Sequence, residues 1–124
     1  MQYNLVFTAG QQEIFLNAYT WHVMSSQDVY GDLWSDNFGE EDLSPSALQK
    51  MHEECHEVLA SMSHVIDGTA EELCRYAQHL WWIRNGYEVD EVGEDFTAKA
   101  LSLRPAKLVV NQETELVDYE VDNG

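Results

Sequence analysis

The chain has 124 residues, enough for one domain and too few for two, so we expect a single domain over residues 1–124. Hydrophobic residues make up 44% of the sequence and can form a buried core, which excludes a disordered acidic tail. Twenty-three acidic residues against six basic ones give a formal net charge of -17, which disfavours direct binding to nucleic acid or to an anionic membrane.

The first two expected elements are a strand and a helix. Residues 3–8 are rich in β-branched and aromatic side chains and predict a strand. Thr8 and Gln11 have the spacing of a capping box, so a helix is expected to follow as far as about Met24. Helical spacing predicts that the buried side of this helix consists of Ile14, Phe15, Ala18, Trp21 and His22.

A loop and a second helix come next. Residues 25–42 contain two glycines and six acids and predict a loop, with a short helical turn around residues 29–34. Ser44 followed by Pro45 predicts a helix start, because serine caps a helix and proline fits its first turn. This helix is expected to end at residues 67–68, and its apolar stripe is Leu48, Met51, Cys55, Leu59, Met62 and Ile66.

The third helix is expected to start at once and to lie antiparallel to the second. Thr69 and Glu72 form another capping-box pair, and Asn85 with Gly86 predicts the end of the helix. Its buried side is expected to be Leu73, Tyr76, Ala77, Leu80 and Ile83. Trp81 and Trp82 are neighbours in sequence and cannot both face one core, so one of them should lie near the surface.

The last third of the chain completes the fold class. Residues 87–98 are acidic and predict an irregular loop, and residues 99–103 fit a helix or a strand equally well. Residues 107–111 and 115–121 predict two strands joined by a short polar turn. We therefore expect an α+β fold, with a three-helix layer packed on a small antiparallel sheet made of the N-terminal strand and the C-terminal hairpin.

The acidic residues are distributed unevenly, and this asymmetry predicts a binding surface for a basic partner. Residues 1–49 contain seven acids and not one lysine or arginine. Carboxylates one helical turn apart lie about 5–6 Å from each other, comparable in scale to the charge spacing of a nucleic-acid backbone. A basic groove shaped for phosphates would accept such an array. The predicted partner-binding residues are Asp32, Asp36, Glu40, Glu41, Asp42, Glu53 and Glu57, with Glu88, Asp90 and Glu91 as a second patch.

Residues 52–56 read His-Glu-Glu-Cys-His and match the H-E-x-x-H pattern, in which two histidines bind zinc and the glutamate acts as a base. The motif resembles that of the zincin metalloproteases, whose motif helix is generally flanked by uncharged residues. Lys50, Glu54 and Glu57 depart from that pattern. We therefore assign no catalytic residue, no metal ligand and no cofactor, and we keep metal binding or metal-dependent catalysis by His52 and His56 as an alternative.

The predicted N-terminal strand, the aromatic first helix, the acidic loop and the high negative charge together resemble small proteins of bacteriophages and mobile elements. Some of these inhibit host defence, among them anti-CRISPR and antirestriction proteins that imitate DNA. The resemblance implies a non-enzymatic inhibitor that occupies the nucleic-acid-binding site of a CRISPR effector, a nuclease or another DNA-binding protein. It carries no motif, so it transfers no functional residue. A structural or assembly protein that docks or forms a homodimer through an aromatic surface remains an alternative.

The start of the sequence and its cysteines bear on the compartment. Residues 1–7 lack the basic region and apolar run of a signal peptide, so we expect a cytoplasmic protein, in the host cytoplasm if a phage encodes it. Cys55 and Cys74 fall in different expected helices, and in a reducing compartment such lone cysteines are expected to be small buried hydrophobic residues.

Overall fold

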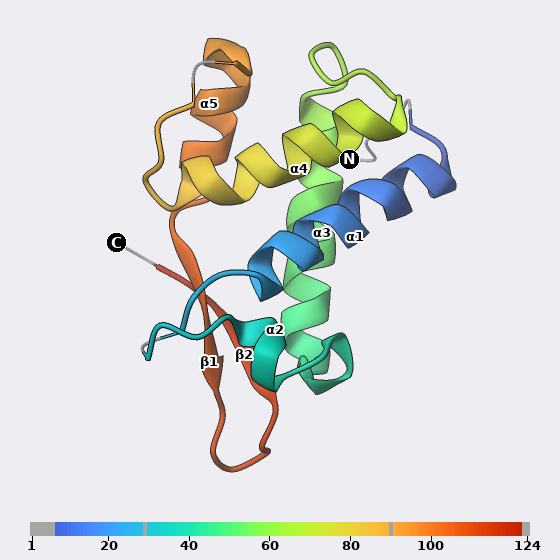
Figure 1. Ribbon diagram of the computed structural model, residues 1–124. Helices are drawn as coiled ribbons and strands as arrows, with labels where there is room; N and C mark the ends of the chain where they lie inside the picture. The colour runs from blue at the N-terminus through green and yellow to red at the C-terminus, as the bar shows by residue number, and fades with distance from the viewer. Residues whose placement is uncertain (1–6, 29, 90, 123–124) are drawn as a thin grey trace.

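The computed structural model describes residues 7–28, 30–89 and 91–122, and it has the α+β fold class that the sequence predicts. The helical elements are α1 (Ala9–Met24), α2 (Trp34–Asn37), the 3-10 turn η1 (Glu40–Asp42), α3 (Pro45–Ser61), α4 (Ala70–Arg84) and α5 (Gly93–Ser102). The strands β1 (Ala106–Val110) and β2 (Val117–Val121) form an antiparallel hairpin, as Figure 1 shows. Among the described residues, no helix combines the length and the apolar character needed to cross a membrane.

The three long helices begin where the sequence predicts, because each is capped by a side chain. The hydroxyl of Thr8 accepts a hydrogen bond from the backbone N–H of Gln11, and the Gln11 side chain accepts one from the N–H of Thr8. Ser44 caps α3 by accepting from the N–H of Ala47 at 3.0 Å. Thr69 accepts from the N–H of Glu72 at 3.3 Å and caps α4. These bonds satisfy N–H groups that a helix start otherwise leaves without a partner.

The sheet of the described residues consists of the C-terminal hairpin alone. Ala106 is paired with Val121, Leu108 with Tyr119 and Val110 with Val117. The side chains of Ala106, Leu108, Val117 and Tyr119 alternate toward the core and are buried. Of the predicted N-terminal strand, residues 3–6 lie outside the described residues, and Phe7 and Thr8 are not part of a strand.

The prediction that α3 and α4 pack together as an antiparallel pair is wrong, since α4 packs chiefly on α1. These two helices run parallel, and α3 crosses behind them (Figure 1). At their starts Gln11 Nε2 donates to the carbonyl of Gly68 at 3.0 Å, and near their ends the rings of His22 and Trp82 are 6.5 Å apart. The physical reason lies in α1, which carries apolar residues around its circumference and can pack on both α3 and α4.

Two other boundaries differ from the prediction. Helix α3 ends at Ser61, and the chain reaches Thr69 through a turn that buries Ile66. Residues 93–102 form α5, where we expected an irregular segment up to residue 98. Phe96 and Ala100 are one helical turn apart and fully buried, so a helix places both side chains in the core. The acids of the first turn also stabilise the start of this helix.

Candidate partner-binding surface

Arg84 is a cation inside the core, where α1, α3, α4 and β2 meet. Its side chain is 0% exposed, and it binds the Glu54 carboxylate with two nitrogens, at 2.8 Å from Nη1 to Oε1 and 3.0 Å from Nη2 to Oε2. Nε donates to the Arg104 carbonyl at 2.7 Å, and Nη2 donates to the Leu103 carbonyl at 2.9 Å. This bidentate pair neutralises one base and one acid inside the fold.

Two tyrosine hydroxyls complete this buried cluster. Arg84 Nη1 donates to the hydroxyls of Tyr19 at 2.9 Å and Tyr119 at 2.7 Å. Tyr119 donates its own proton to Glu54 Oε1 at 2.6 Å, so the 2.6 Å bond between the two hydroxyls is a donation from Tyr19 to Tyr119. Burial is the main reason why the pKa of both hydroxyls is raised well above the ordinary value. The cluster joins four elements and is structural.

The remaining bases lie at or beyond α3. Arg75 Nε binds Glu72 Oε2 at 2.5 Å, and Lys99 Nζ lies 3.4 Å from Glu57 Oε1. Lys50 Nζ lies 3.5 Å from the carbonyl oxygen of Tyr119. Arg104 and Lys107 are exposed near the start of β1. Three of the six bases are therefore paired with carboxylates of α3 or α4.

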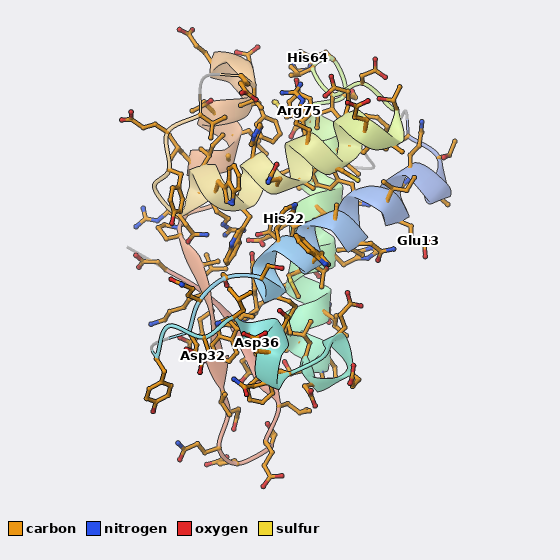
Figure 2. The ribbon with its side chains drawn as sticks, in the orientation of Figure 1. Glu13, His22, Asp32, Asp36, His64 and Arg75 are labelled. Carbon is orange, nitrogen blue, oxygen red and sulfur yellow. The ribbon has the colours of Figure 1, made fainter. Side chains whose placement is uncertain are left out.

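The predicted acids of residues 32–42 lie near the hairpin, where Figure 2 labels Asp32 and Asp36. Asp36 Oδ2 accepts from the N–H of Leu33 at 3.3 Å, and Asp42 Oδ2 accepts from the N–H of Gly39 at 2.8 Å. These two carboxylates start α2 and η1 and so have a local role. The other three are exposed, and within the described part of the chain no side chain binds their carboxylates: Asp32, Glu40 and Glu41. We call these three residues the acidic segment.

The two predicted acids of α3 differ from each other. Glu53 is exposed and accepts a hydrogen bond from Gln49 Nε2 at 3.0 Å. Glu57, one turn later, is half-buried and paired with Lys99 of α5. Of the two, Glu53 is therefore the one whose carboxylate is not neutralised by a base.

The second predicted patch belongs to the link between α4 and α5. Glu88 is exposed, and Glu91 Oε2 lies 4.0 Å from both Arg75 Nη1 and His79 Nε2. Asp90 lies outside the described residues. This link runs beside α5, whereas the acidic segment lies near α2 and the hairpin, so the structure does not bring the two groups together (Figure 1).

His52 and His56 stand one turn apart on α3, with nearly parallel rings and centroids 6.4 Å apart. Cys55 between them faces the core, where burial raises the pKa of its thiol, while Cys74 is exposed. The expectation of two buried cysteines is therefore wrong for Cys74, which lies on the outer side of α4. No group of three histidine, cysteine, aspartate or glutamate side chains in residues 7–28, 30–89 and 91–122 could hold a metal ion.

An open groove of about 840 Å³ lies between the ends of α1 and α4, strand β1, residues 25–28 and residues 33–34. We call it the aromatic groove. Its aromatic side chains are Trp21, His22, Trp34, Trp81, Trp82 and Tyr87, and its charged ones are Asp28 and Lys107. Trp81 is 7% exposed and Trp82 is 38% exposed, which confirms that only one of them faces the core. Trp21 is 61% exposed instead of buried, because Phe15, Tyr19 and Val23 form the core side of α1.

Four rings form a row across α4 and α1, in which histidine and tryptophan alternate. The ring centroids of His79 and Trp82 are 5.7 Å apart, those of Trp82 and His22 are 6.5 Å apart, and those of His22 and Trp21 are 4.9 Å apart. Burial lowers the pKa of His22, with the nearby His79 as a second cause, and burial also lowers the pKa of His79. Both imidazoles are therefore neutral at pH 7, and the row carries no charge of its own.

Comparison of the chain with protein-family models, curated proteins and solved structures gave no match. Two surfaces of this chain bear on its function: the acidic segment and the aromatic groove.

Proposed function

We propose that this protein is a non-enzymatic inhibitor that occupies the positively charged nucleic-acid site of a target protein. The target is a cytoplasmic CRISPR effector complex, a nuclease or another DNA-binding protein. A carboxylate array competes for a phosphate-binding groove because the groove attracts any dense negative charge, at long range and with a rate that falls as salt rises.

The observation that carries this proposal is the acidic segment. Its three carboxylates are exposed and unneutralised, in a half of the chain that has no lysine or arginine up to residue 49. Three of the six cations are engaged with acids away from this segment, Arg84 inside the core and Arg75 and Lys99 with acids of α4 and α3. Glu53 on α3 is a further exposed acid.

The proposal is tested with two variants that each remove three negative charges, from different segments of the chain. Asp32→Asn/Glu40→Gln/Glu41→Gln neutralises the acidic segment and leaves the local bonds of Asp36 and Asp42 intact. The matched control neutralises three exposed acids of the hairpin: Glu113→Gln/Glu115→Gln/Glu120→Gln. A pull-down from cell lysate, with and without added DNA, identifies the target, whose Kd is then measured at two salt concentrations.

We expect DNA to compete with the protein for the target. The acidic-segment variant should weaken binding by at least roughly tenfold more than the hairpin variant, because the surface position of the charge determines the contact. Equal losses in both variants, or a complex that DNA leaves intact, would contradict the proposal.

A second candidate is an assembly protein that docks or dimerises through the aromatic groove. The exposure of Trp21 and of Tyr87, at 61% and 66%, favours it, since exposed aromatic side chains are common interface anchors. Light scattering across salt concentrations separates the two functions. A self-interface through apolar side chains persists in high salt, whereas an electrostatic complex weakens there.

A further inference from the structure

We infer that the aromatic groove binds an arginine-bearing segment of a partner protein, with the guanidinium stacked on the exposed tryptophan rings. This inference concerns a different surface from the acidic segment and does not depend on the proposed inhibition of a nucleic-acid site.

The rings of the groove fit a guanidinium. Tryptophan is the best aromatic partner for a cation within about 6 Å of its ring, and the planar arginine head group stacks on such faces with little loss of hydration. Trp21 and Trp82 belong to one row of rings with His22 between them, and both tryptophans have exposed surface. The row therefore places two partly exposed tryptophan rings within reach of one extended segment.

The ends of two helices add a negative field. Helices α1 and α4 run parallel, and both of their last turns line the groove, through Trp21 and His22 of α1 and Trp81 and Trp82 of α4. A helix C-terminus carries a partial charge of about -0.5, which favours a bound cation. The basic residue in the last turn of α4 is Arg84, which is directed inward to Glu54 and does not face the groove.

Charged side chains at the groove have opposite effects. Asp28 lines it with a carboxylate that also accepts from the N–H groups of Tyr30 and Asp32, at 2.8 and 3.1 Å, so its position is held by the loop. Lys107 lines the β1 side and repels a cation. The inference therefore predicts that removing the Lys107 charge strengthens binding.

Net charge decides between an arginine segment and other occupants of an aromatic surface. Single-stranded nucleic acid also stacks on tryptophan, but a chain of net charge -17 repels its phosphates. A second copy of this chain carries the same charge and is repelled in the same way. A basic segment is attracted, and a volume of about 840 Å³ accommodates an arginine together with its neighbours.

The test uses a blocked Gly-Arg-Gly-Arg-Gly peptide and its citrulline counterpart, which has the same shape and no charge. Binding to the whole chain is followed at physiological salt by the indole N–H resonances of the tryptophans and by tryptophan fluorescence. The arginine peptide should shift the indole signals of Trp21 and Trp82, and the citrulline peptide should bind at least about tenfold more weakly. Equal binding of the two peptides would overturn the inference, because the groove would then recognise the size and apolar surface of the side chain and not its charge.

Three variants localise the binding. Trp21→Leu keeps an apolar side chain and removes one aromatic ring, and Trp21→Ala/Trp82→Ala removes two, so both should weaken binding of the arginine peptide, the double variant by about tenfold or more. Lys107→Gln should tighten it about two- to threefold. The control Leu48→Ala/Leu101→Ala changes exposed apolar residues of α3 and α5 and should leave binding unchanged. Full affinity in the folded double variant would overturn the inference.

The acidic-segment variant distinguishes the two proposals. Asp32→Asn/Glu40→Gln/Glu41→Gln should change the arginine-peptide affinity by less than about threefold while weakening the complex with a nucleic-acid-binding target. If that variant abolishes peptide binding and the tryptophan variants do not, the groove inference fails and the inhibitor proposal stands.

Discussion

Replacement of Arg84 by methionine tests whether the buried cluster holds the fold together. Methionine has a similar length and no charge, so Arg84→Met leaves the Glu54 carboxylate without its cation, at a site where that side chain is only 16% exposed. It also removes the donor that reaches the hydroxyls of Tyr19 and Tyr119 and the carbonyls of Leu103 and Arg104. Removing one partner of a buried ion pair costs about 3–5 kcal/mol, because the other charge remains in the core.

The loss should be measurable by urea unfolding followed by circular dichroism. With a slope of about 2 kcal/mol per molar urea for a small domain, the loss corresponds to a midpoint lowered by roughly 1.5–2.5 M. Lys107→Met is the control, since that side chain is exposed, and it should change the free energy of unfolding by less than about 0.5 kcal/mol.

The double variant Arg84→Met/Glu54→Leu distinguishes the contribution of the ion pair to the free energy of unfolding from the contribution of the surrounding hydrogen bonds. Glu54→Leu alone should also destabilise strongly, since it leaves the guanidinium without a carboxylate. Removing both charges should cost much less than the sum of the two single variants, because only uncharged groups then lack a partner: the Tyr119 hydroxyl and the carbonyls of Leu103 and Arg104, at about 1–3 kcal/mol for each that stays buried. A loss below about 1 kcal/mol in Arg84→Met, or strict additivity in the double variant, would refute the assignment of Arg84 as the central structural cation.

Three other predictions follow from buried or capping groups. The raised pKa of Tyr19 and Tyr119 means that their stabilisation is complete below the unfolded value of 10.0 and is lost as pH rises above it, so the urea midpoint should fall from about pH 10 upward. An unchanged midpoint between pH 9 and 11 would contradict this. Ser44→Ala should lower the free energy of unfolding by about 1 kcal/mol in the same assay, because it removes the acceptor for the N–H of Ala47, and an unchanged midpoint would contradict the cap. A thiol reagent should modify Cys74 in the native protein and reach Cys55 only after unfolding, and two thiols reacting at once would contradict the burial of Cys55.

Local signals in the sequence are sufficient for most element boundaries. Thr8, Ser44 and Thr69 each place a hydroxyl where a helix needs an acceptor, and all three start helices in the structure. The hairpin follows from alternation of apolar and polar residues. Helix α5 is missed because Gly93 and two acids at its start are typical of loops, and its helical state depends on burying Phe96 against Tyr76 at 4.8 Å between ring centroids.

Helix packing is harder to predict because it depends on which face each helix buries. Apolar residues surround α1, so spacing alone does not distinguish the stripe of Ile14 and Trp21 from the observed stripe of Phe15, Tyr19 and Val23. Since the observed stripe accommodates α4 as well as α3, the short link between the latter two does not make them partners. Sequence proximity was the wrong guide to contact here.

The buried ion pair does have a signal in the sequence. Arg84 follows Leu73, Ala77 and Leu80 at spacings of four, three and four residues, which is the period of a core-facing stripe. Glu54 stands three residues after Met51 and four before Val58, both buried on α3. A base and an acid on the buried stripes of two different helices indicate that they meet, since neither tolerates burial alone.

The two candidate surfaces are suited to different features of one basic partner. The acidic segment offers exposed carboxylates that attract cations at a distance, up to about the 10 Å Debye length at 0.1 M salt. Such contacts raise association rates and depend on salt, but each surface pair contributes little affinity. The aromatic groove has the opposite character, because its π faces act at contact distance and are screened less by salt when the site is covered. A complex that uses both should therefore associate faster at low salt, with a slope set by Asp32, Glu40 and Glu41, and should dissociate faster when Trp21 and Trp82 are removed.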